Sequence, residues 1–458
     1  MPKSSKKNYD YDLIVLGSGS GGGVAAHIAA GLGKKVAIVE PEEIGGECPN
    51  WGCVPTKALL HSAELYHNAK NGKPYGIKAD VDFNYKQVKE WKDLAVLRTG
   101  TSEGKKLFNS QGIDIIKGWG HFLEPHKIST GKKRYTSKNF LIATGTVNFI
   151  PPILGLDKCQ YITYREAINL TKLPKSIFVI GGGAIGCEFA SLFATFGVKT
   201  QIAEIAEHLI PKEDRENGEF ISRTFEKDYG IKVLNSAKVV KVQQLSNGKK
   251  KVFYKRGYEN KSTIVDEILV ASGKRANVDI GLENAGVEYT PKSIITDSTM
   301  QTSAKHIYAA GDVAGPYMFT HMASYQSKIA AHNMFHRDKK HTDYKAVPRC
   351  VFIRPEIANV GVTEQELIDK KMPYSIGFSP VNVIGRSNTE DNPSGFVKVL
   401  VNNKDVLVGA SIAAPRAGEM IHELTVAIQN GLTAQAVANT IHAFPTWSEA
   451  VRLACAKI

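Results

Sequence analysis

One pattern of strand-like runs, three glycines and a closing acid occurs twice in this chain of 458 residues. Each copy has a short apolar run, then Gly-x-Gly-x-x-Gly, then a helix-forming run and a second apolar run that ends in glutamate. The glycines and the acid are Gly17, Gly19, Gly22 and Glu40 in the first copy, and Gly181, Gly183, Gly186 and Glu204 in the second. The acid follows the first glycine by 23 residues in both copies.

This pattern is typical of a strand–helix–strand unit that binds a dinucleotide. The glycines allow a tight turn and let a pyrophosphate approach the helix N-terminus, and the acid accepts a hydrogen bond from a ribose hydroxyl. A lone glycine triplet is weak evidence, and the alternative is a glycine-rich turn without a ligand. Two copies at equal spacing predict an α/β chain with two Rossmann-like dinucleotide-binding domains.

Two cysteines, Cys48 and Cys53, follow the first pattern within the segment Gly45–Lys57. A disulfide needs Cα atoms roughly 5.5–6 Å apart, whereas residues five apart in a regular helix are separated by about 7.5 Å of rise. Pro49 and Gly52 lie between the cysteines, and both favour a departure from regular helix. The spacing alone leaves two interpretations open, a redox-active dithiol and a pair of ordinary buried thiols.

Two dinucleotide patterns beside a cysteine pair favour the redox interpretation. They suggest a relay in which hydride passes from a nicotinamide to a flavin and electrons then pass to a disulfide. Cys159, Cys187 and Cys350 are isolated in the sequence and are predicted to be structural. Six cysteines in so long a chain do not indicate a disulfide-stapled secreted scaffold.

Composition limits the class of protein further. The chain is too long for one compact core, and about three domains are expected. No apolar run approaches the roughly 20 residues of a membrane span, and the lysine-rich N-terminus has no apolar segment of signal-peptide type. We therefore expect a cytoplasmic protein without a membrane partner.

The net charge of +13 raises the question of an acidic partner or a nucleic acid. The lysines are scattered, and their short runs have the character of solvated loop and strand-end charges. These runs are Lys132–Arg134, Lys249–Lys251 and Lys339–Lys340. We expect no nucleic-acid partner.

Three further segments extend the redox pattern over nearly the whole chain. Leu141–Gly145 has the form of a linker strand, Ile307–Asp312 that of a second flavin motif, and Val351–Gly361 that of the start of an interface domain. With the glycine patterns and the cysteine pair, in this order and approximate spacing, the chain resembles the class I pyridine-nucleotide disulfide oxidoreductases. Dihydrolipoamide dehydrogenase, glutathione reductase and mercuric reductase belong to that family.

The resemblance implies the organisation of the chain and its ligands. It implies an FAD-binding domain in two segments (1–152 and 275–344), an NAD-binding domain (153–274) and a C-terminal α+β dimerisation domain (345–458). FAD and NAD would be the cofactors, NADH and a small-molecule electron acceptor the partners, and a two-fold homodimer the assembly. Residues implied to contact the cofactors, beyond the glycine patterns, are Thr144, Gly145, Gly273, Gly311 and Asp312.

The resemblance also implies catalytic roles and no resident metal. Cys53 would be the thiol nearest the flavin, and Cys48 the interchange thiol that attacks the substrate. Lys57 would lie near the flavin and pair with Glu188 on the helix of the second glycine pattern, the alternative being an ordinary surface lysine. His321, after the Asp312 motif, is expected to be a packed or capping residue rather than an acid/base group.

The chain departs from the family near its C-terminus. The family's thiol reductases carry a histidine directly before Pro-Thr, five residues ahead of a glutamate; here Phe444 stands at the histidine's position and Glu449 is the glutamate. Phenylalanine cannot move the protons that dithiol–disulfide exchange requires. His442 is the alternative proton carrier, on the same face of an extended chain about 7 Å away. A smaller departure is Ala271–Asn277, a loose version of the family's Ala-Thr-Gly-Arg-x-Pro-Asn.

Three classes of function remain open from the sequence. The first is an NADH-dependent reductase of a dithiol or disulfide such as dihydrolipoamide, with NADH preferred to NADPH because of Glu204. The second is a reductase of metal ions or quinones, although only Cys455, and no adjacent cysteine pair, lies near the C-terminus. The third is a non-catalytic flavoprotein, which the intact cysteine pair disfavours.

Overall fold

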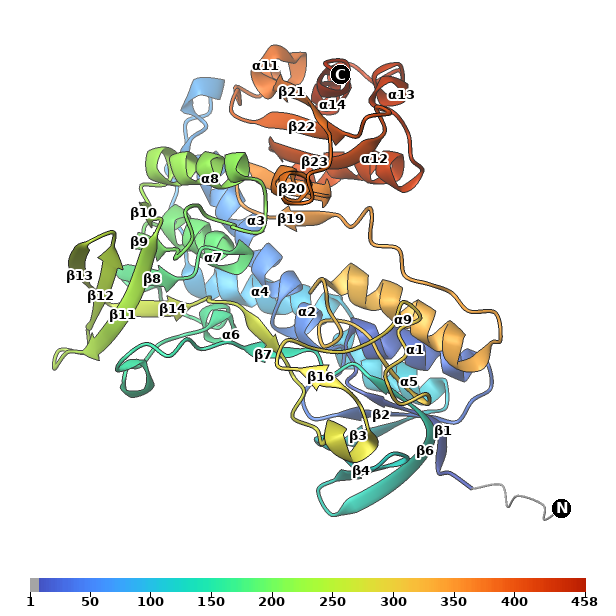
Figure 1. The fold of residues 1–458 in the computed structure, drawn as a ribbon. Coiled ribbons are helices and arrows are strands. Elements are labelled where there is room, and N and C mark those ends of the chain that lie inside the picture. Colours follow the sequence, from blue (N-terminus) through green and yellow to red (C-terminus); the bar gives the residue numbers. More distant parts are fainter. Residues whose placement is uncertain (1–7) are drawn as a thin grey trace. The chain divides into compact units, whose positions relative to one another are not determined.

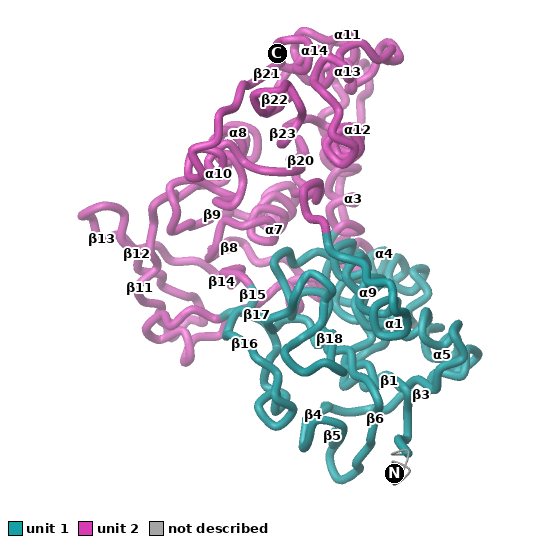
Figure 2. Tube along the Cα trace, turned by 45° about the vertical axis from the view of Figure 1, so that its right-hand side comes forward, with its two compact units in different colours: residues 1–56, 90–149, 274–342 teal, residues 57–89, 150–273, 343–458 magenta. Residues whose placement is uncertain are grey.

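The computed structural model describes residues 8–458, which form two compact units. In Figure 2 the first unit, in teal, comprises the chain up to Thr56, Glu90–Phe149 and Lys274–Thr342. The second unit, in magenta, comprises Lys57–Lys89, Ile150–Gly273 and Asp343–Ile458. The second unit contains both the segment expected to bind NAD and the segment expected to form the dimer. The division of the chain into the four segments given above therefore stays a prediction.

A largely parallel sheet forms the centre of the first unit. Its parallel strands are β3 (Ile113–Lys117), β2 (Val36–Glu40), β1 (Tyr11–Leu16), β6 (Lys133–Ile142) and β18 (Ile307–Ala309). Leu13, Ile14 and Val15 of β1 are fully buried, because a parallel sheet of this kind is covered on both faces. The helices α1 (Ser20–Gly31) and α9 (Thr320–Phe335) pack together in this unit.

The same sheet carries an antiparallel extension. The strands β4 (Gly120–Glu124) and β5 (Lys127–Thr130) continue from β6, with Phe122 and Ile128 fully buried. The helix α5 (Gly104–Ser110) lies against β3. A two-stranded sheet of β7 (Thr146–Asn148) and β15 (Lys274–Ala276) and a hairpin of β16 (Tyr289–Thr290) and β17 (Ser293–Ile294) complete the unit's strands.

The second unit contains a four-stranded parallel sheet and a three-stranded antiparallel sheet. The parallel strands, in order, are β10 (Lys232–Leu234), β9 (Lys199–Ala203), β8 (Ser176–Ile180) and β14 (Glu267–Val270). The helices α7 (Ala184–Thr195) and α8 (Arg215–Asp228) belong to it. The antiparallel strands are β11 (Ala237–Gln244), β12 (Lys250–Arg256) and β13 (Glu259–Val265), side by side in Figure 1.

The C-terminal part of the second unit is an antiparallel sheet with helices. Its strands run in the order β19 (Arg349–Val351), β20 (Glu356–Gly361), β23 (Leu407–Ala414), β22 (Phe396–Val401) and β21 (Ser375–Pro380). The helices α12 (Ala417–Gln429), α13 (Ala434–Ala438) and α14 (Glu449–Cys455) share its core. The predicted fold class, two Rossmann-like parts and a C-terminal α+β part, is confirmed.

The remaining elements are helices or short 3₁₀ segments. The helices are α2 (Glu47–Asn50), α3 (Cys53–Lys70), α4 (Tyr85–Arg98), α6 (Tyr164–Ala167), α10 (Glu364–Asp369) and α11 (Gly385–Thr389). The 3₁₀ segments are Lys73–Tyr75, Thr101–Glu103, Leu156–Lys158, Leu282–Ala285 and Val381–Val383. Among the described residues, no helix is long and apolar enough to cross a membrane.

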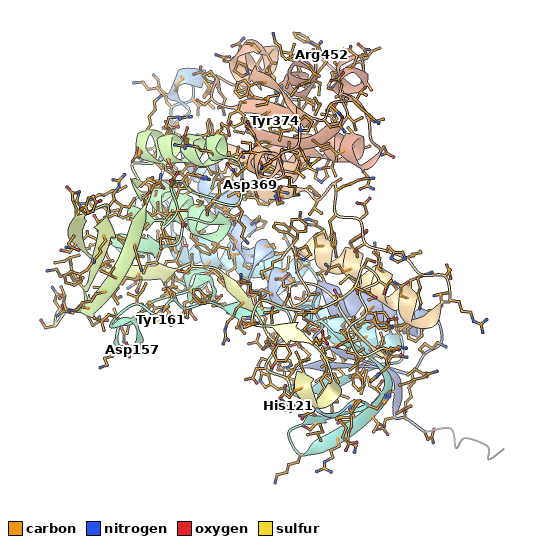
Figure 3. The ribbon with its side chains drawn as sticks, in the orientation of Figure 1. His121, Asp157, Tyr161, Asp369, Tyr374 and Arg452 are labelled. Carbon is orange, nitrogen blue, oxygen red and sulfur yellow. The ribbon has the colours of Figure 1, made fainter. Side chains whose placement is uncertain are left out.

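A buried lysine connects the parallel-sheet and C-terminal parts of the second unit. Lys398 of β22 is only 2% exposed, and its Nζ lies 3.3 Å from Asp214 and 2.9 Å from Glu216, with Glu364 as a third partner. Tyr374, labelled in Figure 3, donates a hydrogen bond of 2.8 Å to Glu364. Burial lowers the pKa of Lys398, but these carboxylates outweigh it and raise the pKa to about 12.

We expect Lys398→Met to lower the free energy of unfolding by about 3–5 kcal/mol, because it leaves the buried carboxylate of Asp214 and the partly buried one of Glu364 without their cation. Urea denaturation measures the loss, and Lys404→Met, at an exposed turn position, is the matched control. Because folding raises the pKa of Lys398, the stability that it contributes depends on pH. This contribution is fully present below pH 10.5 and is lost as pH rises through about 12. Equal stability of the two variants would contradict the argument.

Candidate functional site

The first glycine loop joins β1 to α1 through a backbone turn that tolerates no side chain. Gly17 has a φ of +104°, and a Cβ on it would lie 2.3 Å from the carbonyl oxygen of Ala143. A Cβ on Gly22 would lie 1.8 Å from the carbonyl oxygen of Gly17. Gly19 is the N-cap of α1 and, among the described residues, no side chain caps this helix. The N-terminus of α1 can therefore receive an anionic group.

Glu40 closes this loop from the end of β2. Its carboxylate is buried and accepts hydrogen bonds from the Ser18 amide (2.8 Å) and the Ser18 hydroxyl (2.7 Å). It also accepts one from the amide of Glu42 at 2.9 Å. The acid thus holds the glycine turn in place while standing where a ribose would be recognised.

The second loop repeats this geometry between β8 and α7. Gly181 has a φ of +108°, and a Cβ on Gly186 would lie 2.0 Å from the carbonyl oxygen of Gly181. The N-cap Gly183 has φ −72° and ψ −176°, close to the −64° and −174° of Gly19. Glu204 is buried and accepts from the amides of Gly182 (2.7 Å) and Ala206 (2.9 Å). Both loops fit a dinucleotide.

The expected flavin motif lies beside β7 and β15 in the first unit. Burial raises the pKa of Asp312, and the nearby charge of Lys274 opposes that rise. The hydroxyl of Thr146 donates to Asp312 over 3.5 Å. The hydroxyl of Thr144 donates to the carbonyl of Asn277 at 2.8 Å. This bond connects the segment between β6 and β7 to the segment that follows β15.

Three further glycines of the prediction occupy conformations that favour glycine. Gly145 has a φ of +64°, Gly311 of +83° and Gly273 of +110°. The amide of Gly311 donates to the buried Gln326 side chain at 2.8 Å. Gly273 lies in the loosely matching segment 271–277 and keeps a positive φ, so this segment still forms the turn. A Cβ on Gly273 would face open space.

The cysteine pair spans a break between two helices. Cys48 lies in α2, Cys53 begins α3, and the amide of Gly52 turns back to the carbonyl of Glu47 at 2.7 Å. This break brings the thiols together, which a regular helix could not do. Both are thiols rather than a disulfide in this structure, Cys48 half-buried and Cys53 exposed, and Cys53 Sγ lies 3.8 Å from the Thr320 hydroxyl. Hydrogen bonding to Cys53, together with burial, raises the pKa of Cys48.

An ion pair lies four residues further along α3, in the second unit. The Nζ of Lys57 donates to both carboxylate oxygens of Glu188 at 2.9 Å. The amide of Phe352 donates to the same carboxylate at 3.0 Å, and Lys57 Nζ lies 4.5 Å from the centre of the Phe352 ring. The expected Lys57–Glu188 pair is thus present. Phe352 was missed, because its hydrogen bond to Glu188 uses the backbone amide, which leaves no signal in residue type, and its ring contact with Lys57 depends on the fold.

The C-terminal residues do not form the histidine–glutamate pair of the thiol reductases that the chain resembles, in keeping with Phe444 at the histidine's position. Phe444 is 76% exposed, with its ring against Gly385. His442 is held through both ring nitrogens, by Glu423 at 2.7 Å and the Thr440 carbonyl at 2.8 Å. Glu449, at the start of α14, accepts a long hydrogen bond of 3.4 Å from the amide of Thr446.

The other candidate side chains have structural surroundings. His321 is exposed in the first turn of α9, and its ring stacks on Phe319 with centroids 5.3 Å apart. Burial raises the pKa of Cys455 to about 12, and burial also raises that of Cys187. Within residues 8–458, no cluster of three or more histidine, cysteine or acidic side chains could hold a metal ion.

Comparison with known proteins identifies the family. The family model described as pyridine nucleotide-disulphide oxidoreductase matches residues 11–327, and the model of its dimerisation domain matches residues 347–455. The chain belongs to the pyridine nucleotide-disulphide oxidoreductases. It is accordingly a flavoprotein oxidoreductase that uses FAD and NAD(H), and the glycine loops described above fit these two dinucleotides.

Curated relatives of this oxidoreductase cover nearly its whole length. Dihydrolipoyl dehydrogenase of Bacillus subtilis (strain 168) is 35% identical over 96% of this chain and 94% of its own. The enzyme of the same name from Geobacillus stearothermophilus is 36% identical over the same shares.

A solved structure is similar in fold and in length. The Cu(II) complex of the HOCl-induced flavoprotein disulfide reductase RclA from Escherichia coli has a TM-score of 0.86 and 28% identity. It covers 97% of this chain and 99% of its own.

We expect this oxidoreductase to prefer NADH, with a kcat/KM at least about tenfold above that for NADPH, because the Glu204 carboxylate would repel a 2′-phosphate. No arginine follows it at Ile205 or Ala206. Glu204→Ala should narrow the ratio of the two kcat/KM values, whereas Glu207→Ala, at an exposed neighbouring carboxylate, should not. A variant that merely folds less well keeps the same ratio of the two kcat/KM values, because both values fall together. A wild-type preference for NADPH would overturn the argument.

Proposed function

We propose that this protein is an NADH-dependent reductase in which Cys48 and Cys53 carry electrons to an acceptor that needs no positioned acid. The observation that carries the proposal is the cysteine pair itself, brought together by the break between α2 and α3. When bound, FAD supplies the pair with the two electrons that NADH delivers as hydride. All other steps belong to residues of this chain.

The two cysteines have different roles in this proposal. The hydrogen bond between the two thiols, together with burial, raises the pKa of Cys48, which supports assigning the first negative charge of the pair to Cys53. Cys53 is therefore proposed as the thiolate that receives electrons beside the flavin. Cys48 is proposed as the interchange thiol, and it must lose its proton before it attacks.

Reduction of a disulfide by this pair requires two exchanges. The Cys48 thiolate attacks one sulfur of the acceptor, which forms a mixed disulfide and releases one thiolate. The Cys53 thiolate then attacks the sulfur of Cys48, which closes the Cys48–Cys53 disulfide and releases the second thiolate. A base must take the proton of Cys48, and an acid must protonate each leaving group.

The residue at the family's proton-carrying position does not support those proton transfers. Phe444 has no titratable group, and both ring nitrogens of His442 are already engaged, by Glu423 and Thr440. We therefore propose slow turnover with lipoamide or glutathione disulfide. Lys57 and Glu188 are proposed to support the flavin and nicotinamide side of the site, which this departure leaves unchanged.

Reduction of a metal ion that binds thiolates is the candidate reaction that needs no positioned acid, because it has no leaving group to protonate. Two thiolates bind a soft cation readily. Two Cu(II) ions would each take one electron as the cysteine pair closes to its disulfide and its two protons pass to solvent, so atoms and electrons balance without an acid. The structural similarity to the Cu(II) complex of RclA supports this candidate. Quinones are a further acceptor class of the same kind.

The cysteine assignment is tested by single substitutions. Under anaerobic titration with NADH, the wild type should develop a long-wavelength absorbance band from the Cys53 thiolate. Cys53→Ser should abolish the band, and Cys48→Ser should retain or strengthen it, while both lose acceptor reduction. Cys159→Ser, at a buried cysteine outside the pair, is the control. Full acceptor turnover in both pair variants would remove the cysteines from the mechanism.

The acceptor assignment is tested at Phe444. We expect Phe444→His to raise lipoamide reductase activity by about 10²-fold, within the range for a positioned acid–base group, with NADH reduction of the flavin unchanged. Phe444→Leu is the matched control and should leave lipoamide turnover low. Cu(II) turnover should be similar in all three proteins.

A further pair of results separates the alternatives. Fast wild-type lipoamide turnover that survives His442→Ala would show that another group supplies the proton. Loss of that turnover in His442→Ala would instead assign the role to His442, contrary to the contacts with Glu423 and Thr440.

A further inference from the structure

One face of the β11–β13 sheet carries four exposed or half-buried lysines and no acid. Three cross-strand rows make up this face, here called the lysine face. The rows are Lys238–Lys255–Asn260, Lys241–Phe253–Ser262 and Gln243–Lys251–Ile264. The opposite face is largely buried, with Val242 and Val252 almost fully enclosed, so the lysine face is the outer side of the sheet.

Lysines elsewhere on the same sheet have acidic partners. Lys250 lies 2.8 Å from Glu267, Lys249 3.7 Å from Asp266, and Lys261 2.5 Å from Glu259. On the lysine face, by contrast, no carboxylate among the described residues lies within ion-pair distance of any of the four ammonium groups. The unpaired charge is therefore specific to this face of the sheet.

Electrostatic repulsion among these lysines lowers the stability of the sheet, and a role in preventing strand pairing at a sheet edge does not explain why they are there. Lys238 and Lys255 stand directly opposite each other, and like charges in that position destabilise an antiparallel pair. Lysines on edge strands can serve to prevent strand pairing. Lys251 and Lys255, however, lie on the central strand β12, which has no free edge. A bound anionic surface would offset the repulsion.

Apolar side chains lie among these charges. Phe253 is at the centre, with Lys241 Nζ and Lys251 Nζ at 5.5 and 5.0 Å from its ring centroid. Ile264 is 52% exposed in the adjoining row, and Tyr258 is fully exposed in the turn between β12 and β13. Helices that bind at a membrane interface likewise combine basic side chains with exposed Trp, Phe and Leu.

We propose that the lysine face docks the enzyme reversibly on an anionic lipid surface. Nine residues are too few for a standard protein–protein interface, which uses about 20–30 residues a side. Phe253 is already contacted by two ammonium groups, which disfavours base stacking of a nucleic acid. An anionic bilayer needs neither shape matching nor a stacking platform, and each lysine near it contributes independently. This departs from the expectation of no membrane partner, which rested on the lack of a membrane span and of a signal-peptide segment and did not address binding at a lipid surface.

The test is sedimentation of the FAD-loaded enzyme with lipid vesicles. Phosphatidylcholine vesicles with about 30% phosphatidylglycerol are compared with pure phosphatidylcholine at low salt. The wild type should partition to the anionic vesicles alone, and salt of about 0.5 M should release it. Replacing Lys238, Lys241, Lys251 and Lys255 by glutamine should lower the partition coefficient by about fivefold for each lysine.

A control variant separates position from net charge. It replaces four other exposed cations by glutamine: Lys132, Lys133, Arg134 and Lys138. The partition coefficient of the control variant should stay within about twofold of the wild-type value, because a loss of about fivefold per residue is expected only for lysines that lie at the lipid surface. NADH oxidation without vesicles should be unchanged in both variants. If the quadruple variant loses FAD, the double variant Lys251→Gln and Lys255→Gln replaces it, with about 25-fold weaker partition expected.

Several outcomes would overturn the proposal. Equal binding to both kinds of vesicle, or an equal loss in the control variant, would remove the role of this face. Binding of a single-stranded oligonucleotide or of polyglutamate that depends on these lysines, without dependence on them for vesicles, would assign the face to a nucleic acid or to an acidic protein instead.

Discussion

The contact on which both nucleotide sites depend is the approach of one backbone to another. In each loop the third glycine lies against the carbonyl oxygen of the first, where a Cβ would stand at 1.8 or 2.0 Å. That contact forces the chain to turn at the end of a strand and start a helix within a few residues. The strand–helix order, the open helix N-terminus and the position of the closing acid all follow from it.

Electrostatics in the second unit show two uses of buried charge. The Lys57–Glu188 pair is simple and partly open to solvent on the lysine side, 33% against 6% exposed. The Lys398 group places a buried ammonium beside three carboxylates, of which Asp214 is buried and Glu216 is 46% exposed. Such a group ties elements together, because removing the lysine leaves the buried Asp214 carboxylate without its cation. The pair at Lys57 keeps its lysine end accessible to solvent.

Local pattern was sufficient to predict much of this molecule. The spacing of glycines between apolar runs predicted β1, α1, β8 and α7, because such turns are fixed by sterics within a few residues. The cysteine spacing predicted a break in the helix, which the turn at Gly52 provides. The resemblance supplied the Lys57–Glu188 pair, which joins residues 131 positions apart.

Contacts that depend on tertiary structure were not predictable in the same way. Lys398 has an ordinary sequence context, and only the packing of β22 near the start of α8 shows that it is buried among acids. Phe352 contacts Glu188 through its amide, which every residue but proline possesses. The pairing of His442 with Glu423 likewise needs the fold of α12, so its proximity to Phe444 in sequence was a poor guide to its surroundings.

The two closing acids differ in how many lone pairs they have left. A carboxylate has about four acceptor positions. Glu40 uses three of them on Ser18 and Glu42, whereas Glu204 uses two, on Gly182 and Ala206. The acid of the second loop therefore has capacity for both hydroxyls of a ribose, and that of the first for only one. Recognition of the sugar should contribute more to binding at the second loop than at the first, where the rest of the ligand must supply the affinity.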